Sequence, residues 1–260
     1  HVIGPKAIAT RPEIEQIMIA GPRDLALQDE FEKNLYLIRR RIEKRVIAAQ
    51  IPAFYICSLS SRTIIYKGLF LAQNIADFYP DLLHPHFVSR FAIFHQRYAT
   101  NVMPAWERAQ PLRMLAHNGE INTVWGNRAR MDARASGIPL ECHPLITPDG
   151  SDSTSLDEAI ELIARNGRTL GESIRMLLPP ALAGRRASAF LRYSIDCAEP
   201  WDGPAALAFS DGRVVGAALD RNGLRPCRFA VTRTGLVVAG SEAGLVDLDP
   251  EEVINSGRLG

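Results

Sequence analysis

The sequence lacks an excess of charge of one sign, a long hydrophobic run and a secretory signal. Its formal net charge is +1 over 260 residues, which gives no electrostatic footprint for nucleic acid or for an anionic membrane. No apolar run approaches the roughly 20 residues that a membrane-spanning helix needs. The opening HVIGP lacks the basic and apolar regions of a signal peptide. We therefore expect a cytoplasmic protein that binds neither nucleic acid nor membranes.

Cysteine is scarce, and an initiator methionine is absent. No Cys-x-x-Cys pair occurs, so zinc and redox motifs have no support, and free thiols in a reducing compartment are expected. His84 and His86 flank Pro85 without a third ligand nearby, so no metal site is predicted. The chain begins with histidine, which predicts that it is processed or excised from a longer one. The cysteines are Cys57, Cys142, Cys197 and Cys227.

What is present suits a folded domain, because 47% of the residues are hydrophobic and 23% are charged. Apolar periodicity predicts helices at residues 24–50, 69–79, 126–136, 156–164, 169–178 and 187–194. The arginine-rich cluster at 39–45 is interpreted as the solvated face of the first helix, since acidic residues interleave with it. Ser153 or Ser155 is expected to cap the helix at 156–164, and Thr169 with Glu172 to form a capping box.

Strands are predicted at 14–20 and 91–94, and as hairpins joining 53–59 to 63–66, 205–209 to 214–219, and 229–232 to 236–239. The tail from residue 250 starts like another helix. Hairpins therefore flank a helical middle, which favours an α+β class with antiparallel sheets packed against helices. The length of 260 residues suggests one large domain or two small ones.

The stretch from 91 to 127 carries two polar clusters on either side of a loop that contains Pro104 and Pro111. The first cluster, HQRYATN at 95–101, follows the expected buried strand at 91–94. The second, AHNGE at 116–120, is expected in a loop. Polar residues at a strand end beside a polar loop are a common way to build a site.

Three features of these clusters and of the GSDS loop at 150–153 could bind a small amino acid. Arg97 could grip a carboxylate or form an edge salt bridge. Asn118 and Gly119 could form an oxyanion hole or an ordinary turn. Asp152 could bind an ammonium group or support a helix N-terminus. Together they are the parts of an amidase site without its nucleophile, because the adjacent Cys142 and His143 are unsuited to act as a dyad.

Five motifs resemble the glutamine amidotransferase domain of glutamate synthase large chains, in the family's order from about residue 10 to the end. They are HQRYATN at 95–101, AHNGEINT at 116–123, GSDSTSLDEAIE at 150–161, EPWDGPAALAFSDG at 199–212 and LDRNGLRP at 219–226. The resemblance implies a four-layer αββα N-terminal-nucleophile hydrolase sandwich, incomplete at its N-terminus, with residues 1–260 as a single partial domain. It also implies hydrolysis of L-glutamine to glutamate and ammonia, with the ammonia passing to a synthase domain of the same chain. FMN, an iron–sulfur cluster and 2-oxoglutarate are implied for that full-length enzyme and not for this domain, with a small NADPH-oxidising subunit as a further partner.

By motif match, Arg97 would hold the glutamine α-carboxylate, Asp152 the α-ammonium group, and Asn118 with Gly119 the oxyanion. Tyr98 and Thr100 would line the pocket, while His95, Gln96 and His117 are assigned structural roles. The family's nucleophile is an N-terminal cysteine, whereas His1 stands first here. We therefore expect residues 1–260 alone to be inactive, and the missing strands to leave apolar sheet edges exposed. A non-catalytic glutamine-binding or regulatory module and a purely structural domain remain as alternatives.

Overall fold

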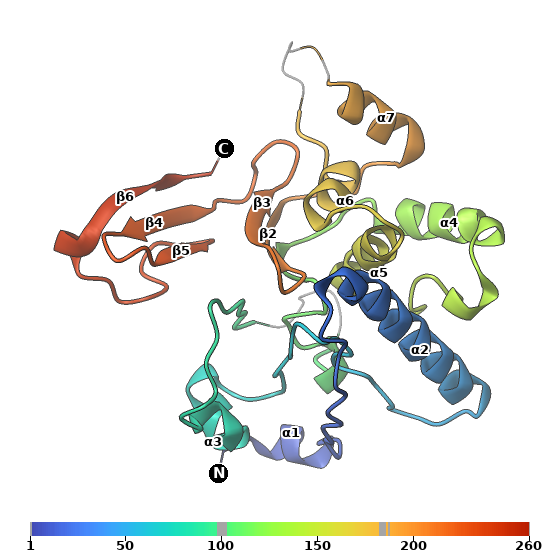
Figure 1. The fold of residues 1–260 in the computed structure, drawn as a ribbon, viewed down its shortest axis with the longest axis horizontal. Helices are drawn as coiled ribbons and strands as arrows, with labels where there is room; N and C mark the ends of the chain where they lie inside the picture. Colours follow the sequence, from blue (N-terminus) through green and yellow to red (C-terminus); the bar gives the residue numbers. More distant parts are fainter. Residues whose placement is uncertain (1, 98–102, 182–185, 187, 260) are drawn as a thin grey trace.

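The computed structural model describes residues 2–97, 103–181, 186 and 188–259, and Figure 1 gives their course. Short 3-10 turns connect several of the elements. The helices are α1 (Pro5–Ala9), α2 (Gln28–Ala48), α3 (Ile75–Phe78), α4 (Val124–Arg134), α5 (Asp152–Arg165), α6 (Leu170–Leu177) and α7 (Ala189–Cys197). The strands are β1 (Leu115–Gly119), β2 (Ala205–Ser210), β3 (Val215–Leu219), β4 (Arg228–Thr232), β5 (Val237–Gly240) and β6 (Val253–Arg258).

The strands form two antiparallel sheets of three, in the orders β1-β2-β3 and β5-β4-β6. The two late hairpins predicted from the sequence are confirmed. The β2–β3 turn uses Gly212 at φ 85°, a conformation that glycine adopts without steric cost. The tail starts with a 3-10 turn at Pro250–Glu252, in agreement with its helix-like start. That turn leads directly into β6 beside β4, a strand that the sequence did not predict.

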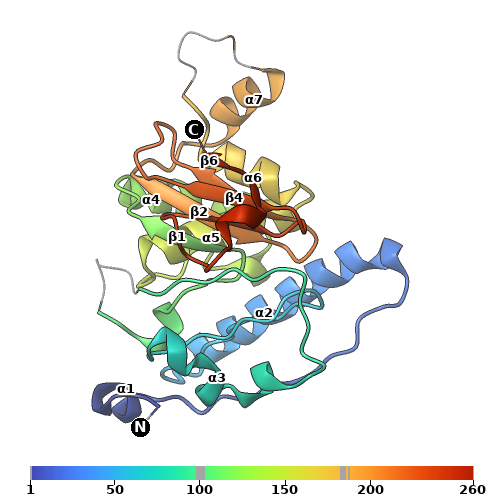
Figure 2. The same cartoon turned by 90° about the vertical axis from the view of Figure 1, so that its left-hand side faces the viewer.

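Figures 1 and 2 show the two sheets in successive layers, with helices on the far side of the first sheet. Helices α5 and α6 back the sheet β1-β2-β3, and the sheet β5-β4-β6 lies on its other side. Within the described ranges, no helix covers the outer face of β5-β4-β6. The structure therefore confirms a mixed fold of helices and antiparallel sheets, with a helix layer on one side.

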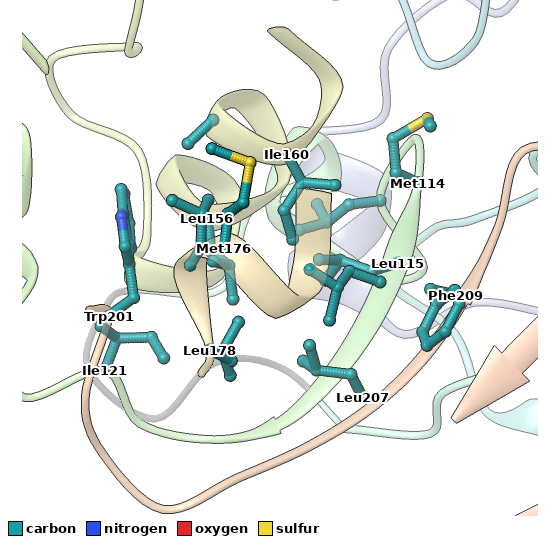
Figure 3. Close-up of a cluster of buried hydrophobic side chains, with 14 of the residues drawn as sticks. Met114, Leu115, Ile121, Leu156, Ile160, Met176, Leu178, Trp201, Leu207 and Phe209 are labelled. Atoms are coloured by element: carbon teal, nitrogen blue, oxygen red, sulfur yellow. The ribbon is translucent and has the colours of Figure 1, made fainter. Parts of the chain in front are cut away.

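The main core lies between the first sheet and its helices, as Figure 3 shows. Leu156 and Ile160 from α5 are fully buried against Leu115 of β1 and Leu207 of β2. The spacing of these buried residues agrees with the repeat of a helix and with that of a strand. Leu156 and Ile160 are four apart on a helix, and Leu115 lies on the strand face opposite to that of its neighbours. Burying such side chains contributes about 1.5–3 kcal/mol each.

Helix α5 begins earlier than predicted, and this determines the place of Asp152. Ser151 is the N-cap, and its hydroxyl accepts a hydrogen bond from Thr154 N at 3.1 Å. Neither Ser153 nor Ser155 caps the helix, so Asp152 is its first residue. The predicted capping box of Thr169 and Glu172 on α6 is confirmed in both of its hydrogen bonds.

Three predicted strands or hairpins in the first hundred residues are wrong. Residues 14–20, the pair 53–59 with 63–66, and residues 91–94 are neither strand nor helix. Ile17 and Met18 are 80% and 78% exposed. A strand needs a neighbour that pairs with it, and local apolar content does not supply one.

The interpretation of the arginine cluster on α2 as a solvated face is wrong for its first two arginines and confirmed for Arg41, Lys44 and Arg45, which are exposed. Helix α2 agrees well with the predicted span, yet Arg39 and Arg40 are buried while Ile38 and Ile42 are exposed. Arg39 pairs with Glu43 one turn away and with Glu161 on α5. Glu161 lies far away in sequence, so local charge patterning could not reveal that this face is covered.

Candidate functional site

The proposed oxyanion pair lies at the end of a strand, and the predicted loop at 116–120 is wrong. Asn118 and Gly119 are the last residues of β1, opposite Ala206 and Ala205 of β2. Both are partly exposed, whereas the first three residues of β1 are buried. Side chains alternate across a strand, so Asn118 lies on the sheet face opposite to that of Leu115 and His117.

Gly119 is required by packing at this strand end. Its φ is 155°, and a Cβ there would lie 1.8 Å from the carbonyl oxygen of Pro204. Gly203 mirrors it, because a Cβ on Gly203 would lie 1.8 Å from Glu120 O. The backbones approach because Glu120 N donates to Pro204 O at 2.9 Å. The absence of a Cβ at Gly119 therefore lets the backbone at Pro204 pack closely against this strand end.

The backbone N–H and C=O groups of His117 point away from β2, toward the outer edge of the sheet. His117 N donates to Gln110 Oε1 at 2.6 Å, and Gln110 Nε2 donates to His117 O at 3.0 Å. Hydrogen-bonding directions alternate along an antiparallel strand, so Gly119 N–H lies on the same outer edge as His117 N–H. Its opposite residue, Ala205, uses its own N–H and C=O with Asp220. The Gly119 donor is thus directed away from the sheet.

Asp152 lies beside this strand end, at the start of α5. Its Oδ2 accepts from Ile121 N at 2.8 Å, and its Oδ1 accepts from Ser153 N at 2.7 Å. Ser153 Oγ also donates to Asp152 Oδ1, at 3.3 Å. An ionised carboxylate has about four acceptor positions, so these three bonds leave capacity for one contact with a ligand cation. The side chain is largely buried, which strengthens any charge pairing made there.

His117 lies between β1 and α5, and its exposed fraction is 2%. Its Nδ1 lies 2.7 Å from Ser153 Oγ. Burial is the main cause that lowers the pKa of His117 to about 4, and the nearby Asp152 carboxylate opposes this shift. The ring is therefore neutral at pH 7. Among the described residues, its Nε2 has no hydrogen-bond partner.

Arg97 lies on an exposed part of the extended segment that approaches β1. Its backbone N–H donates to His95 Nδ1 at 3.1 Å. The His95 ring also hydrogen-bonds to the backbone of His117, and burial lowers the pKa of His95. The structure therefore brings His95, the first residue of the first polar cluster, next to β1. The predicted pocket residues Tyr98 and Thr100 lie outside the described residues.

One structural carboxylate beside the site was not singled out from the sequence. Asp220 accepts four backbone N–H bonds, and one of these comes from Ala205, opposite Gly119. Burial alone would raise its pKa, yet these bonds hold the pKa of Asp220 below its usual value. The signal was present in the LDRNGLRP motif, where an aspartate precedes a glycine-containing turn. A cavity of about 210 Å³ lies beside it, lined by Asp202, Gly203, Asp220, Arg221, Asn222 and Leu224.

Among the described residues, no cysteine forms a hydrogen bond with the polar groups at this strand end. All four cysteines are free, and Cys142 and Cys227 are buried. Cys57 donates to Ile65 O, and Cys227 lies just before β4. Within the described part of the chain, no group of three or more His, Cys, Asp or Glu side chains is arranged so that it could hold a metal ion. No described helix combines the length and apolar character that crossing a membrane requires.

The sequence matches the family of class-II glutamine amidotransferases along residues 1–260. The chain belongs to this family. The amidotransferase chain is 52% identical to the NADPH glutamate synthase large chain of Azospirillum brasilense over all of its own length. It is 43% identical to ferredoxin-dependent glutamate synthase 2 of Synechocystis over 99% of its length. It is 40% identical to the NADPH glutamate synthase large chain of Bacillus subtilis, also over 99%. The chain spans only 17–18% of these relatives.

Proposed function

We propose that residues 1–260 are the glutamine-hydrolysing domain of a glutamate synthase. In this proposal L-glutamine is converted to glutamate and ammonia, and a synthase domain of the same chain transfers the ammonia to 2-oxoglutarate. The observation that carries the proposal is the end of β1, where Asn118 and the outward Gly119 N–H lie beside the Asp152 carboxylate. The relatives named above favour glutamate synthase over other amidotransferases.

The polar groups have complementary roles in this proposal. Arg97 holds the α-carboxylate of glutamine, and Asp152 holds its α-ammonium group. Tyr98 and Thr100 line the pocket. A thiolate attacks the side-chain carbonyl carbon, and the Asn118 amide with Gly119 N–H stabilises the negative oxygen of the tetrahedral intermediate. Ammonia then leaves, and water hydrolyses the thioester to release glutamate.

The nucleophile in this proposal is a cysteine outside residues 1–260. Its free α-amino group would act as the base, as in N-terminal-nucleophile hydrolases. Support comes from the four cysteines of the chain, none of which hydrogen-bonds to Asn118, Gly119 or Asp152 in the described residues. We expect residues 1–260 alone not to hydrolyse glutamine.

The completed domain would be a four-layer αββα sandwich, with residues 1–260 as part of that single domain. Support comes from the sheet β5-β4-β6, where the side chains of Val237 and Ile254 are exposed. An exposed apolar face of this kind is stabilised when a further layer packs on it.

The cofactors of the full-length enzyme, FMN and an iron–sulfur cluster, would be held by its other domains. An iron–sulfur cluster needs several cysteine ligands close together, and the cysteines here lie on separate elements without forming a ligand group among the described residues. Further partners would be the synthase domain and a small NADPH-oxidising subunit, in the cytoplasm.

Glutamine hydrolysis by the full-length protein tests the proposal, with ammonia and glutamate as the measured products. We expect Arg97→Ala to raise KM for glutamine by about 10-fold or more, because a bidentate carboxylate contact is lost. Arg90→Ala, in the same extended segment, is the control and should leave KM unchanged. Binding of glutamine without hydrolysis would favour the non-catalytic module. No interaction with glutamine would favour a structural domain.

A further inference from the structure

Helix α5 contacts strand β1 at three successive levels. At the start of β1, Asp157 Oδ1 accepts from Met114 N at 2.8 Å and from Leu115 N at 3.1 Å. In the middle, Ser153 Oγ meets the His117 ring. Just past its end, Asp152 accepts from Ile121 N. The strand is thus attached along its length to one helix.

The middle contact is the one nearest to the oxyanion pair. Ser153 and Asp157 are four residues apart, so both side chains lie on the face of α5 that meets β1. His117 directly precedes Asn118. Its backbone is held on the outer edge by Gln110 and its side chain by Ser153. In the described residues, Ser153 Oγ is the only hydrogen-bond partner of the His117 side chain.

We propose that Ser153 and His117 are positioning residues for glutamine hydrolysis, and that their contact sets the orientation of Asn118 and Gly119. This inference rests on the proposed function. Neither side chain needs to touch glutamine. Their contact fixes the orientation of the β1 backbone about the strand axis at His117. That orientation sets the directions of the Asn118 side chain and of the Gly119 N–H.

The kinetic consequence follows from when the oxyanion contact forms. Asn118 and Gly119 meet a negative oxygen only as the tetrahedral state develops, so a displaced pair lowers kcat more than it changes substrate affinity. A misplacement on the order of 1 Å costs up to about 100-fold in rate. Asp152 and Arg97 bind the α-groups in the ground state, so loss of their positions would appear in KM.

The test uses Ser153→Ala, His117→Gln and His117→Asn in the full-length protein, assayed for glutamine hydrolysis. Asparagine places an amide group near the position of histidine Nδ1, whereas glutamine places one near Nε2. We expect Ser153→Ala and His117→Gln to lower kcat by about 10- to 100-fold, with KM for glutamine within about 2-fold of wild type. His117→Asn keeps the contact with Ser153 and should retain most of kcat.

Ser173→Ala is the matched control, because Ser173 is a fully buried helical serine whose hydroxyl donates to Thr169 O on α6. Its kcat should equal that of wild type. A wild-type kcat in Ser153→Ala, equal losses in the two His117 variants, or a loss confined to KM would overturn the inference. A wild-type protein that does not hydrolyse glutamine would instead overturn the proposed function.

Discussion

The two sheets are both three-stranded and antiparallel, but their surroundings differ. In the sheet β1-β2-β3, Leu207 is 2% exposed because α5 and α6 cover that face. In the sheet β5-β4-β6, Val237 is 62% and Ile254 is 60% exposed. Strands of both sheets are rich in apolar residues, as in β2 (AALAFS) and β5 (VVAG), so apolar content alone does not determine which sheet is covered.

This difference places the candidate site on the supported sheet. The strand that carries Asn118 and Gly119 is held by α5 on one face and by β2 along one edge. Catalytic groups need such support, because their geometry must hold within a fraction of an ångström. The β5-β4-β6 sheet has no equivalent helix among the described residues, and we assign it no catalytic group.

The largest expected effect comes from truncating the same kind of side chain in the two sheets. Leu207→Ala should lower the free energy of unfolding by about 2–5 kcal/mol, because it removes buried methyl groups and leaves a cavity. Val237→Ala should change it by less than about 0.5 kcal/mol, because that side chain is exposed. Urea unfolding measures both. Equal losses would contradict the difference between the sheets.

A second test concerns the carboxylate that holds the end of β2. Asp220→Ala leaves four backbone N–H groups without their acceptor, so we expect a loss of about 2–4 kcal/mol in the free energy of unfolding. Asp211→Ala is the control, since Asp211 also accepts two backbone bonds but lies at the exposed β2–β3 turn. Its loss should be about 1 kcal/mol or less. Similar losses would show that Asp220 acts as an ordinary turn residue.

The third test is the pH dependence of stability caused by His117. Its pKa is 6.5 in an ordinary environment and about 4 here, so between these values the unfolded chain binds a proton and the folded chain does not. The contribution is present above pH 6.5 and is lost as pH falls toward 4, by up to about 3 kcal/mol. His117→Asn should flatten this slope in urea unfolding from pH 4 to 7. The exposed His86→Asn should leave it unchanged, and an unchanged slope in His117→Asn would refute the assignment.

The smallest effect on stability is expected on the β5-β4-β6 sheet. Val237→Lys should leave the free energy of unfolding within about 0.5 kcal/mol of wild type, because the position is solvent-exposed. It should also reduce association of residues 1–260, since a charge on an exposed apolar strand opposes edge and face pairing. Light scattering at increasing concentration measures this. A destabilised or more aggregated variant would mean that this face is already covered.

The sequence predicted the elements whose signals are local. The helices α2 and α6 and the two late hairpins have periodic apolar residues, and Asp211-Gly212 gives a turn of known type. The motif order also identified the family, which the match along residues 1–260 confirms. These successes need no knowledge of distant partners.

The errors arose where a distant segment decides the structure. Residues 91–94 look like a buried strand, but in the described chain no neighbour pairs with them. The sequence around Arg39 predicts a solvent-exposed side chain, but in the structure Arg39 is paired with the distant Glu161. Likewise, Gly119 meets Pro204, and His117 meets Ser153, across long sequence separations.

The most direct measurement of the central claim is kcat for glutamine hydrolysis by Asn118→Ala in the full-length protein. We predict a loss of about 100- to 1000-fold with a small change in KM, because one oxyanion donor is removed. Asn255→Ala, on the exposed part of β6, should retain the wild-type kcat. A wild-type kcat in Asn118→Ala would contradict the assignment of the β1 strand end as the glutaminase site.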